Sequence, residues 1–244
     1  ITPVTWTRPV ETLKQVRGAS WDSFTEEGCL EVVGGGSNPV AEYDLQVTQA
    51  AREWLSRPHD KPQFILVGTY GPHFPYIVSP ERYRRYQKLL RGNILCRQMP
   101  SELDPVLQKR YLAVMEDEER ALQILAAYHG MIEETDNRLG EVRNAFAQWK
   151  KKYGRKGTLI YASDHGDTCG ERRLYGKMSF FERASRVPLL LEGDHIPQGV
   201  AASDPVSLLD LGPTICGLAV SEPPPRQAGC DLLSARYPAK KAGR

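Results

Sequence analysis

The sequence predicts an α/β fold, a three-layer sandwich with a mostly parallel sheet. Short apolar runs at residues 64–68, 158–163 and 187–191 have the length and composition of buried strands, and stretches with helical spacing lie between them. Strands that alternate with helices are typical of a sheet that helices cover on both faces. The 244 residues are enough for one large domain of this kind.

The expected elements follow one another in order along the chain. Residues 1–40 form an irregular region rich in Thr, Pro and Gly, and apolar residues at helical spacing then predict a helix at 42–55. The first strand leads into a loop interrupted by prolines. Residues 104–149 are expected to be mostly helical, with a break near 128–130, and a last helix is expected at 206–218.

Charge and hydropathy argue against several classes of partner. Lys plus Arg (32) and Asp plus Glu (30) nearly balance, so the net charge of +2 gives no reason to expect nucleic acid or an anionic membrane as a partner. No apolar stretch reaches the roughly 20 residues of a membrane helix, and no signal peptide is recognisable. The five cysteines are widely spaced, which favours a reducing compartment and hence the cytoplasm.

Polar motifs follow two of the predicted strands. His73 lies in the loop after the first strand, and Asp164 and His165 come directly after the second. Because ligands collect where loops leave the carboxyl ends of parallel strands, these side chains could converge on one edge of the sheet. A carboxylate oxygen and an imidazole nitrogen suit a divalent cation. Lys177 follows a glycine and could place an ammonium against an anionic substrate.

Each of these residues also has a simpler interpretation, which the residues themselves leave open. Asp164 and His165 could form a polar turn in which the aspartate caps neighbouring backbone N–H groups. His73, which lies between prolines, could be an ordered loop residue. Lys177 could be a solvated surface lysine.

Four segments in a fixed order resemble one family. They are PHFPY after the first strand, YHGMIEETDNRLGEV on a helix, YASDHGDTCGERRLYGKMSFFERASRVPLLL, and VSLLDLGPTICGLA. Together they resemble the sulfatases of the alkaline phosphatase superfamily, nearest to the choline-sulfatase and arylsulfatase group. The likeness runs from about residue 41 to residue 233, before a tail at 234–244. It implies that residues 1–244 are a partial catalytic domain with an incomplete alkaline-phosphatase-like fold.

The resemblance implies a role for each candidate residue. Asp164 and His165 match a pair of ligands to a divalent cation, with Ca²⁺ as the first choice and Mg²⁺, Mn²⁺ or Zn²⁺ as alternatives. His73 matches the histidine that touches the sulfate and assists the leaving group, and Lys177 matches the lysine that binds sulfate oxygens. The implied activity is metal-dependent hydrolysis of small anionic sulfate monoesters.

The chain also departs from the family's pattern. The family has Gly-Glu-His where residues 170–172 read Gly-Glu-Arg, and Cys169 does not match the nucleophile. That nucleophile is a formylglycine formed within C-x-P-x-R, and the chain contains neither this motif nor two adjacent aspartates. We therefore expect the formylglycine in a segment upstream of Ile1, and we expect the chain alone to be inactive. That segment, or a homo-oligomer, would cover the apolar surface left open.

Two other functions stay open at this point. The same Asp-His pair and lysine would serve a phosphonate monoester or phosphodiester hydrolase of the superfamily, because the tetrahedral anions differ little in size. The absent nucleophile instead favours a non-catalytic module that keeps the sulfatase fold.

Overall fold

The computed structural model divides the chain into two compact units, of which the first ends at Asp194. The first unit contains every residue that the sequence places in the candidate site. The structure describes residues 33–37, 39–92, 118–177, 179–194, 196–224 and 226–234.

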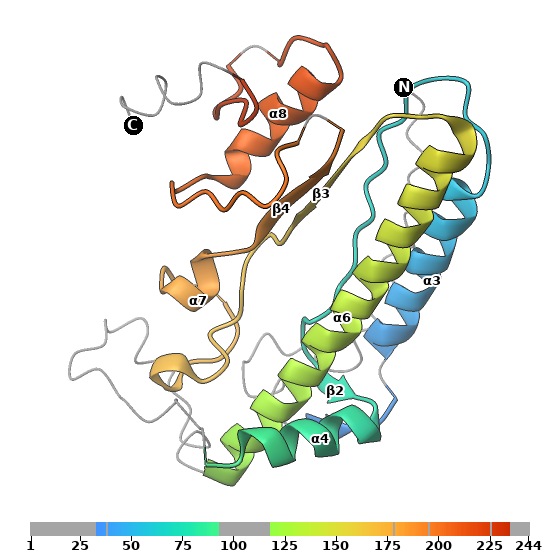
Figure 1. Ribbon diagram of the computed structural model, residues 1–244. Helices are drawn as coiled ribbons and strands as arrows, with labels where there is room; N and C mark the ends of the chain where they lie inside the picture. The colour runs from blue at the N-terminus through green and yellow to red at the C-terminus, as the bar shows by residue number, and fades with distance from the viewer. Residues whose placement is uncertain are drawn as a thin grey trace. The chain divides into compact units, whose positions relative to one another are not determined.

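Two helices form the frame of the first unit. Helix α3 spans Pro39–Leu55 and helix α6 spans Glu118–Tyr153, and Figure 1 shows them side by side. The predicted helix at 42–55 is confirmed. Buried residues of α6 lie in its first half, from Ala121 to Met131, so this half faces the core.

The predicted break of the second helix is wrong, because α6 continues through residues 128–130. Gly130 has a packing role instead: a Cβ atom there would lie 2.8 Å from Cγ1 of Val78. The glycine therefore lets a neighbouring strand approach the helix closely. The earlier part of that prediction, residues 104–117, lies outside the described residues.

A small parallel ladder packs against the first half of α6. Strand β1 (Val33–Gly35) pairs with strand β2 (Tyr76–Val78), and helix α4 (Pro80–Leu90) follows directly. Tyr76 and Val78 are each 1% exposed and share a cluster with Ile124 on α6. Cys169 and Tyr175 belong to the same cluster. A loop far along the chain is therefore anchored in the core beside β2.

The second ladder is antiparallel. Strand β3 (Thr158–Ala162) pairs with strand β4 (Leu189–Gly193), with Ile160 opposite Leu191. Both strands were predicted, although β4 begins two residues later than expected. Between them lie a short 3₁₀ turn, η3 (Glu171–Arg173), and helix α7 (Glu182–Ser185).

The predicted strand at 64–68 does not form in the described part of the chain. Residues 62–69 are not paired with any described strand, and the side chains of Phe64 and Leu66 are 67% and 84% exposed. An apolar run indicates burial, but it becomes a strand only where a neighbour satisfies its backbone groups. The described residues do not supply that neighbour.

The second unit is organised around a buried carboxylate. Asp210 ends the turn η4 (Leu208–Asp210), and its carboxylate accepts hydrogen bonds from the backbone nitrogens of Ser207 (2.9 Å) and Cys230 (2.7 Å). Helix α8 (Leu211–Leu218) follows, so the predicted helix at 206–218 is confirmed over most of its length. Within the described residues of the whole chain, no helix has the length and apolar character of a membrane span.

Candidate active site

The loop that carries His73 is clamped to α3 by a buried aspartate. Asp44 is 3% exposed, and its two carboxylate oxygens accept the backbone N–H groups of Tyr70 and Gly71, each at 2.8 Å. The backbone N–H of His73 then donates to the carbonyl of Tyr70 (2.9 Å). Burial raises the pKa of Asp44, against the opposing effect of the two N–H donors. Backbone hydrogen bonds thus fix the position of His73, independently of its side chain.

The loop that carries Asp164, His165 and Lys177 is held by its own turns. The N–H of Gly166 donates to the carbonyl of Ala184 (2.8 Å), and a Cβ atom at position 166 would overlap the carbonyl oxygen of Arg183. Only glycine fits there. At the other end of the loop, Gly176 has a φ of 72°, a left-handed conformation that glycine adopts without strain.

The side chains of His73 and Lys177 meet, although they are far apart in the sequence. Nζ of Lys177 lies 2.8 Å from Nε2 of His73. Nδ1 of His73 lies 2.9 Å from the carbonyl oxygen of Phe74, which can only accept, so Nδ1 carries a proton. In the neutral ring Nε2 then offers a lone pair to the ammonium of Lys177. The structure thus brings two of the predicted site residues into contact.

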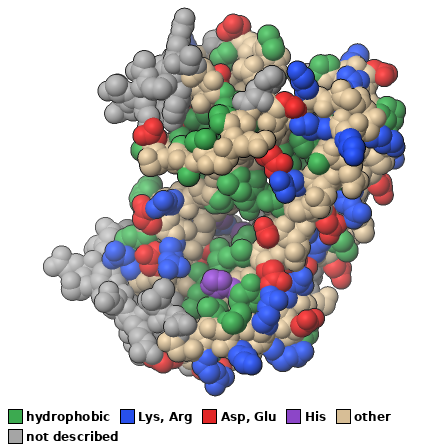
Figure 2. Space-filling model, viewed as in Figure 1, with side chains coloured by type: hydrophobic (Ala, Val, Ile, Leu, Met, Phe, Trp, Pro, Cys, Tyr) green, Lys and Arg blue, Asp and Glu red, His purple; other side chains and the backbone are tan. Residues whose placement is uncertain are grey.

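His165 lies next to this pair. Its ring centroid is 6.5 Å from that of His73, and its Nδ1 lies 2.9 Å from the carbonyl oxygen of Gly166. By the same reasoning, Nε2 of His165 offers a lone pair. Oδ2 of Asp164 lies 3.5 Å from this nitrogen, and the Asp164 side chain is 84% exposed. On the face drawn in Figure 2, histidine side chains reach the surface among hydrophobic side chains.

Asp164 and His165 fit a divalent cation in their chemistry but are too few to hold it. The two lone-pair atoms are close enough to share one ion, and the Nδ1–H of His165 is held by a carbonyl, which is the usual arrangement of a metal-binding imidazole. Ca²⁺, however, takes about six to eight oxygen ligands. No group of three or more His, Cys, Asp or Glu side chains gathers for a metal among the described residues.

The structure describes the surroundings of Arg172 and Cys169, the two residues of this loop that depart from the family's pattern. Arg172 stands where the family has histidine. Its guanidinium lies 4.5 Å from the ring centroid of Phe181. Cys169 is 3% exposed and packs in the core, so its thiol is shielded from solvent. The expectation that Cys169 is not the nucleophile agrees with this burial.

Sequence reasoning missed two residues that organise the site, Asp44 and Asp167. Asp44 sits on an amphipathic helix, and no local signal distinguishes it from a surface carboxylate. Asp167 lies three positions after Asp164 in a segment dense with Gly and Asp, which could have suggested a turn built on its side chain.

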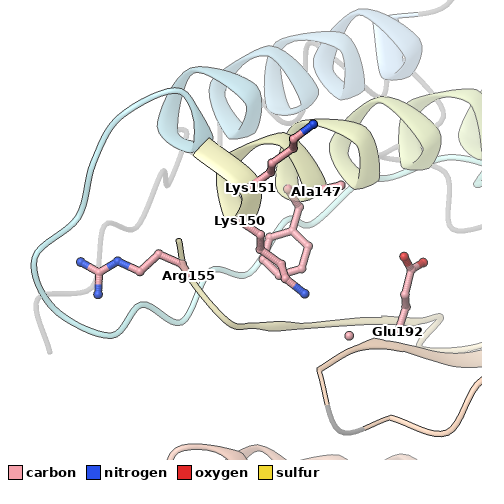
Figure 3. Close-up of a pocket in the computed structure, with 7 residues that line it drawn as sticks. Ala147, Lys150, Lys151, Arg155 and Glu192 are labelled. Carbon is pink, nitrogen blue, oxygen red and sulfur yellow. The ribbon is translucent and has the colours of Figure 1, made fainter. Parts of the chain in front are cut away.

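A separate pocket lies beside the C-terminal end of α6 and is shown in Figure 3. It has a volume of about 380 Å³, and none of the predicted site residues lines it. Nζ of Lys150 is already engaged by the carboxylate of Asp194 (2.6 Å) and by the carbonyl of Gly157 (3.3 Å). The pocket is lined by Phe146, Ala147, Lys150, Lys151, Arg155, Glu192 and Gly193.

Comparisons with known proteins agree on one family. A sequence model of the Sulfatase family matches residues 12–221. Arylsulfatase K of Danio rerio is 43% identical over 102 residues, which cover 42% of this chain and 19% of that protein. Choline-sulfatase of Rhizobium meliloti (strain 1021) is 32% identical over 205 residues, which cover 77% of this chain and 39% of that protein.

Two solved structures show the same fold at low sequence identity. A 2-O GAG sulfatase is 19% identical, with a TM-score of 0.59 over 86% of this chain and 47% of its own. The phosphonate monoester hydrolase SpPMH from Silicibacter pomeroyi is 20% identical, with a TM-score of 0.63 over 93% of this chain and 49% of its own. The chain thus spans less than half the length of these relatives.

Proposed function

The chain belongs to the sulfatase family, and we propose that the protein containing it hydrolyses sulfate monoesters. The observation that supports this most is the 2.8 Å contact between Nζ of Lys177 and Nε2 of His73. A cation and an imidazole at one point suit a tetrahedral anion whose ester oxygen must leave. The substrate would be a small anionic sulfate ester.

Lys177 would bind sulfate oxygens. Sulfur–oxygen cleavage places growing negative charge on the departing oxygen and redistributes it over the sulfate group, and a fixed ammonium stabilises such charge. His73 carries a lone pair at Nε2 in the neutral ring; it would take up a proton there when the anionic ester binds and give that proton to the leaving alcohol oxygen. The hydrogen bond from Nδ1–H to the carbonyl of Phe74 supports this role, because it makes Nε2 the nitrogen that faces Lys177 and the proposed anion site.

Asp164 and His165 would contribute two ligands to a divalent cation, with Ca²⁺ as the first choice. When bound, such a cation would act as a Lewis acid and neutralise part of the charge of the sulfate. The remaining ligands and the formylglycine nucleophile would come from a segment upstream of Ile1, since the chain contains no C-x-P-x-R motif. On this proposal the chain of 244 residues alone has no sulfatase activity.

A phosphonate monoester hydrolase is the second candidate. The phosphonate monoester hydrolase SpPMH matches this fold with a TM-score of 0.63, compared with 0.59 for the 2-O GAG sulfatase. The contact of Lys177 with His73 would serve a phosphonate as well as a sulfate.

An assay of the longer protein separates the two candidates. The protein is tested on an aryl sulfate and on the matching aryl phosphonate, with added Ca²⁺ and after chelation. We expect faster turnover of the sulfate, with loss of activity on chelation and recovery with Ca²⁺. A much faster phosphonate reaction would reverse the order of the candidates, and no turnover of either ester would favour a non-catalytic module.

A further inference from the structure

We propose that Asp167 and Tyr76 are positioning residues that hold Lys177 and His73 at contact distance. In this proposal only Lys177 and His73 contact the substrate, and Asp167 and Tyr76 act through them. Their hydrogen bond joins the two segments that carry the reacting groups. The inference rests on the proposed function of that site, and its experiment keeps the two apart.

The carboxylate of Asp167 receives three hydrogen bonds. Oδ1 accepts the backbone N–H groups of Cys169 (2.7 Å) and Gly176 (3.0 Å), and Oδ2 accepts the hydroxyl of Tyr76 (2.6 Å). Gly176 directly precedes Lys177, and Tyr76 follows His73 by three positions. One carboxylate therefore joins the Lys177 segment to the His73 segment.

A second set of hydrogen bonds holds the segment before Lys177. The backbone N–H and the hydroxyl of Thr168 both donate to the carbonyl of Gly176, at 2.7 and 3.0 Å. Because Thr168 is the neighbour of Asp167, the backbone on both sides of Gly176 is tied to one turn. Lys177 follows this turn, and its Nζ reaches Nε2 of His73.

The His73 segment is held through Tyr76. The Tyr76 side chain is 1% exposed, and its ring packs at 6.1 Å from that of Tyr128 and at 6.5 Å from that of Phe74. The ring of Phe74 lies 4.1 Å from that of His73, and its carbonyl accepts the Nδ1–H of His73. A shift of Tyr76 would thus reach the imidazole through Phe74.

The direction of the Tyr76–Asp167 hydrogen bond is fixed by protonation. Burial, together with the charge of Asp167, raises the pKa of Tyr76 well above its ordinary value, so the phenol keeps its proton and donates it. An amide in place of the carboxylate would turn an NH₂ group toward the phenol oxygen. The phenol proton would then lose its acceptor, although the shape of the side chain is unchanged.

The experiment compares four variants of the longer protein with the wild type. Asp167→Asn and Tyr76→Phe remove the bond from either side, the double variant tests their coupling, and Asp210→Asn is the matched control. Asp210 is also a buried carboxylate that accepts two backbone N–H groups, but it belongs to the other compact unit. For each variant, kcat and KM on an aryl sulfate and the midpoint of thermal unfolding are measured.

We expect Asp167→Asn and Tyr76→Phe each to lower kcat about tenfold or more, with KM changed by less than about threefold, because misplaced catalytic groups slow the chemical step. The double variant should be little slower than either single one, and Asp210→Asn should keep its kcat despite an equal loss of thermal stability. A kcat that falls in step with the unfolding midpoint in all variants, or a normal kcat in Tyr76→Phe, would overturn the proposal.

Absence of turnover in the wild type would count against the proposed function. The positioning role can then be tested separately, by measuring the tautomer of the His73 imidazole. In ¹⁵N spectra of His73 we expect one tautomer, with the proton on Nδ1, in the wild type and in Asp210→Asn. A mixture of tautomers is expected in Asp167→Asn and in Tyr76→Phe. Unchanged His73 spectra in both of these variants would contradict the positioning role.

Discussion

The segment at 64–68 was expected to be a buried strand and the loop at 163–177 to follow one, yet the two behave in opposite ways. The loop is polar, and hydrogen bonds from its own backbone and from Tyr76 fix its shape. The segment is apolar, and Leu66 is 84% exposed. A polar loop can satisfy its donors and acceptors locally, whereas an apolar strand depends on neighbours that only the rest of a sheet can supply.

The two regions differ in how far they depend on the rest of a full-length sulfatase. The match covers 39% of the choline-sulfatase of Rhizobium meliloti and 49% of the phosphonate monoester hydrolase SpPMH. The arrangement of His73 and Lys177 does not require the remainder of such a protein. The burial of Phe64 and Leu66 would require contacts beyond those that the described residues make.

The largest expected effect is that of Lys177→Ala on turnover by the longer protein. We expect kcat on an aryl sulfate to fall by at least about a hundredfold, as for the loss of one preorganised donor to a developing charge. Lys151→Ala is the control, because this lysine lines the pocket beside the end of α6. Near-normal turnover in Lys177→Ala would return the residue to the role of a surface lysine.

The loop should be intolerant of a side chain at its tightest point. Gly166→Ala would push a methyl group into the carbonyl oxygen of Arg183, and we expect the free energy of unfolding to fall by about 3 kcal/mol. Gly140→Ala is the matched control, because nothing lies within 4 Å of a Cβ atom there, and it should stabilise α6 by about 0.5 kcal/mol. Denaturant titration of both variants measures the difference, and equal stabilities would show that the loop can open.

Two aspartates should respond to pH in opposite directions. The pKa of Asp44 is raised above 3.8 by burial, so the folded state binds more protons than the unfolded state, and the contribution of Asp44 to stability falls as pH rises above about 3.8. The pKa of Asp194 is lowered by its hydrogen bond to Lys150, so its contribution is present above 3.8 and is lost as pH falls. Unfolding free energies of Asp44→Asn and Asp194→Asn, each relative to the wild type between pH 3 and 7, should slope with opposite signs.

The smallest effect is expected in the apolar segment. Leu66→Asn should change the unfolding free energy of this chain by less than about 0.5 kcal/mol, because the side chain is already in water. Ile124→Val, at a fully buried position, should cost about 1 kcal/mol. In the longer protein the cost of Leu66→Asn should rise above that of Ile124→Val. An equal and small cost in both proteins would mean that the segment is never buried.

Sequence reasoning predicted the elements whose signals are local. Amphipathic spacing predicted α3, and the apolar run at 158–163 predicted β3. Gly130 misled it, because a glycine needed for close packing looks the same as one that ends a helix. The segment at 64–68 misled it for another reason: its hydrophobicity indicates burial but does not say which part of the protein provides the partner strand.

For the candidate site, sequence reasoning identified the residues in chemically recognisable motifs and missed the two aspartates that fix the backbone around them. His73, His165 and Lys177 stood in motifs of recognisable chemistry, and the structure brings them together. Asp167 and Asp44 act through backbone N–H groups that only the folded chain places around them. The substrate roles of His73 and Lys177, the metal roles of Asp164 and His165, and the cytoplasmic location remain predictions.

The most direct test of the account is a crystal structure of the longer protein with inorganic sulfate. We predict a sulfate ion with one oxygen within hydrogen-bond distance of Nζ of Lys177 and another near Nε2 of His73. The account would be contradicted if sulfate bound only elsewhere, such as beside Lys151 and Arg155 at the end of α6, and left the contact between Lys177 and His73 unchanged.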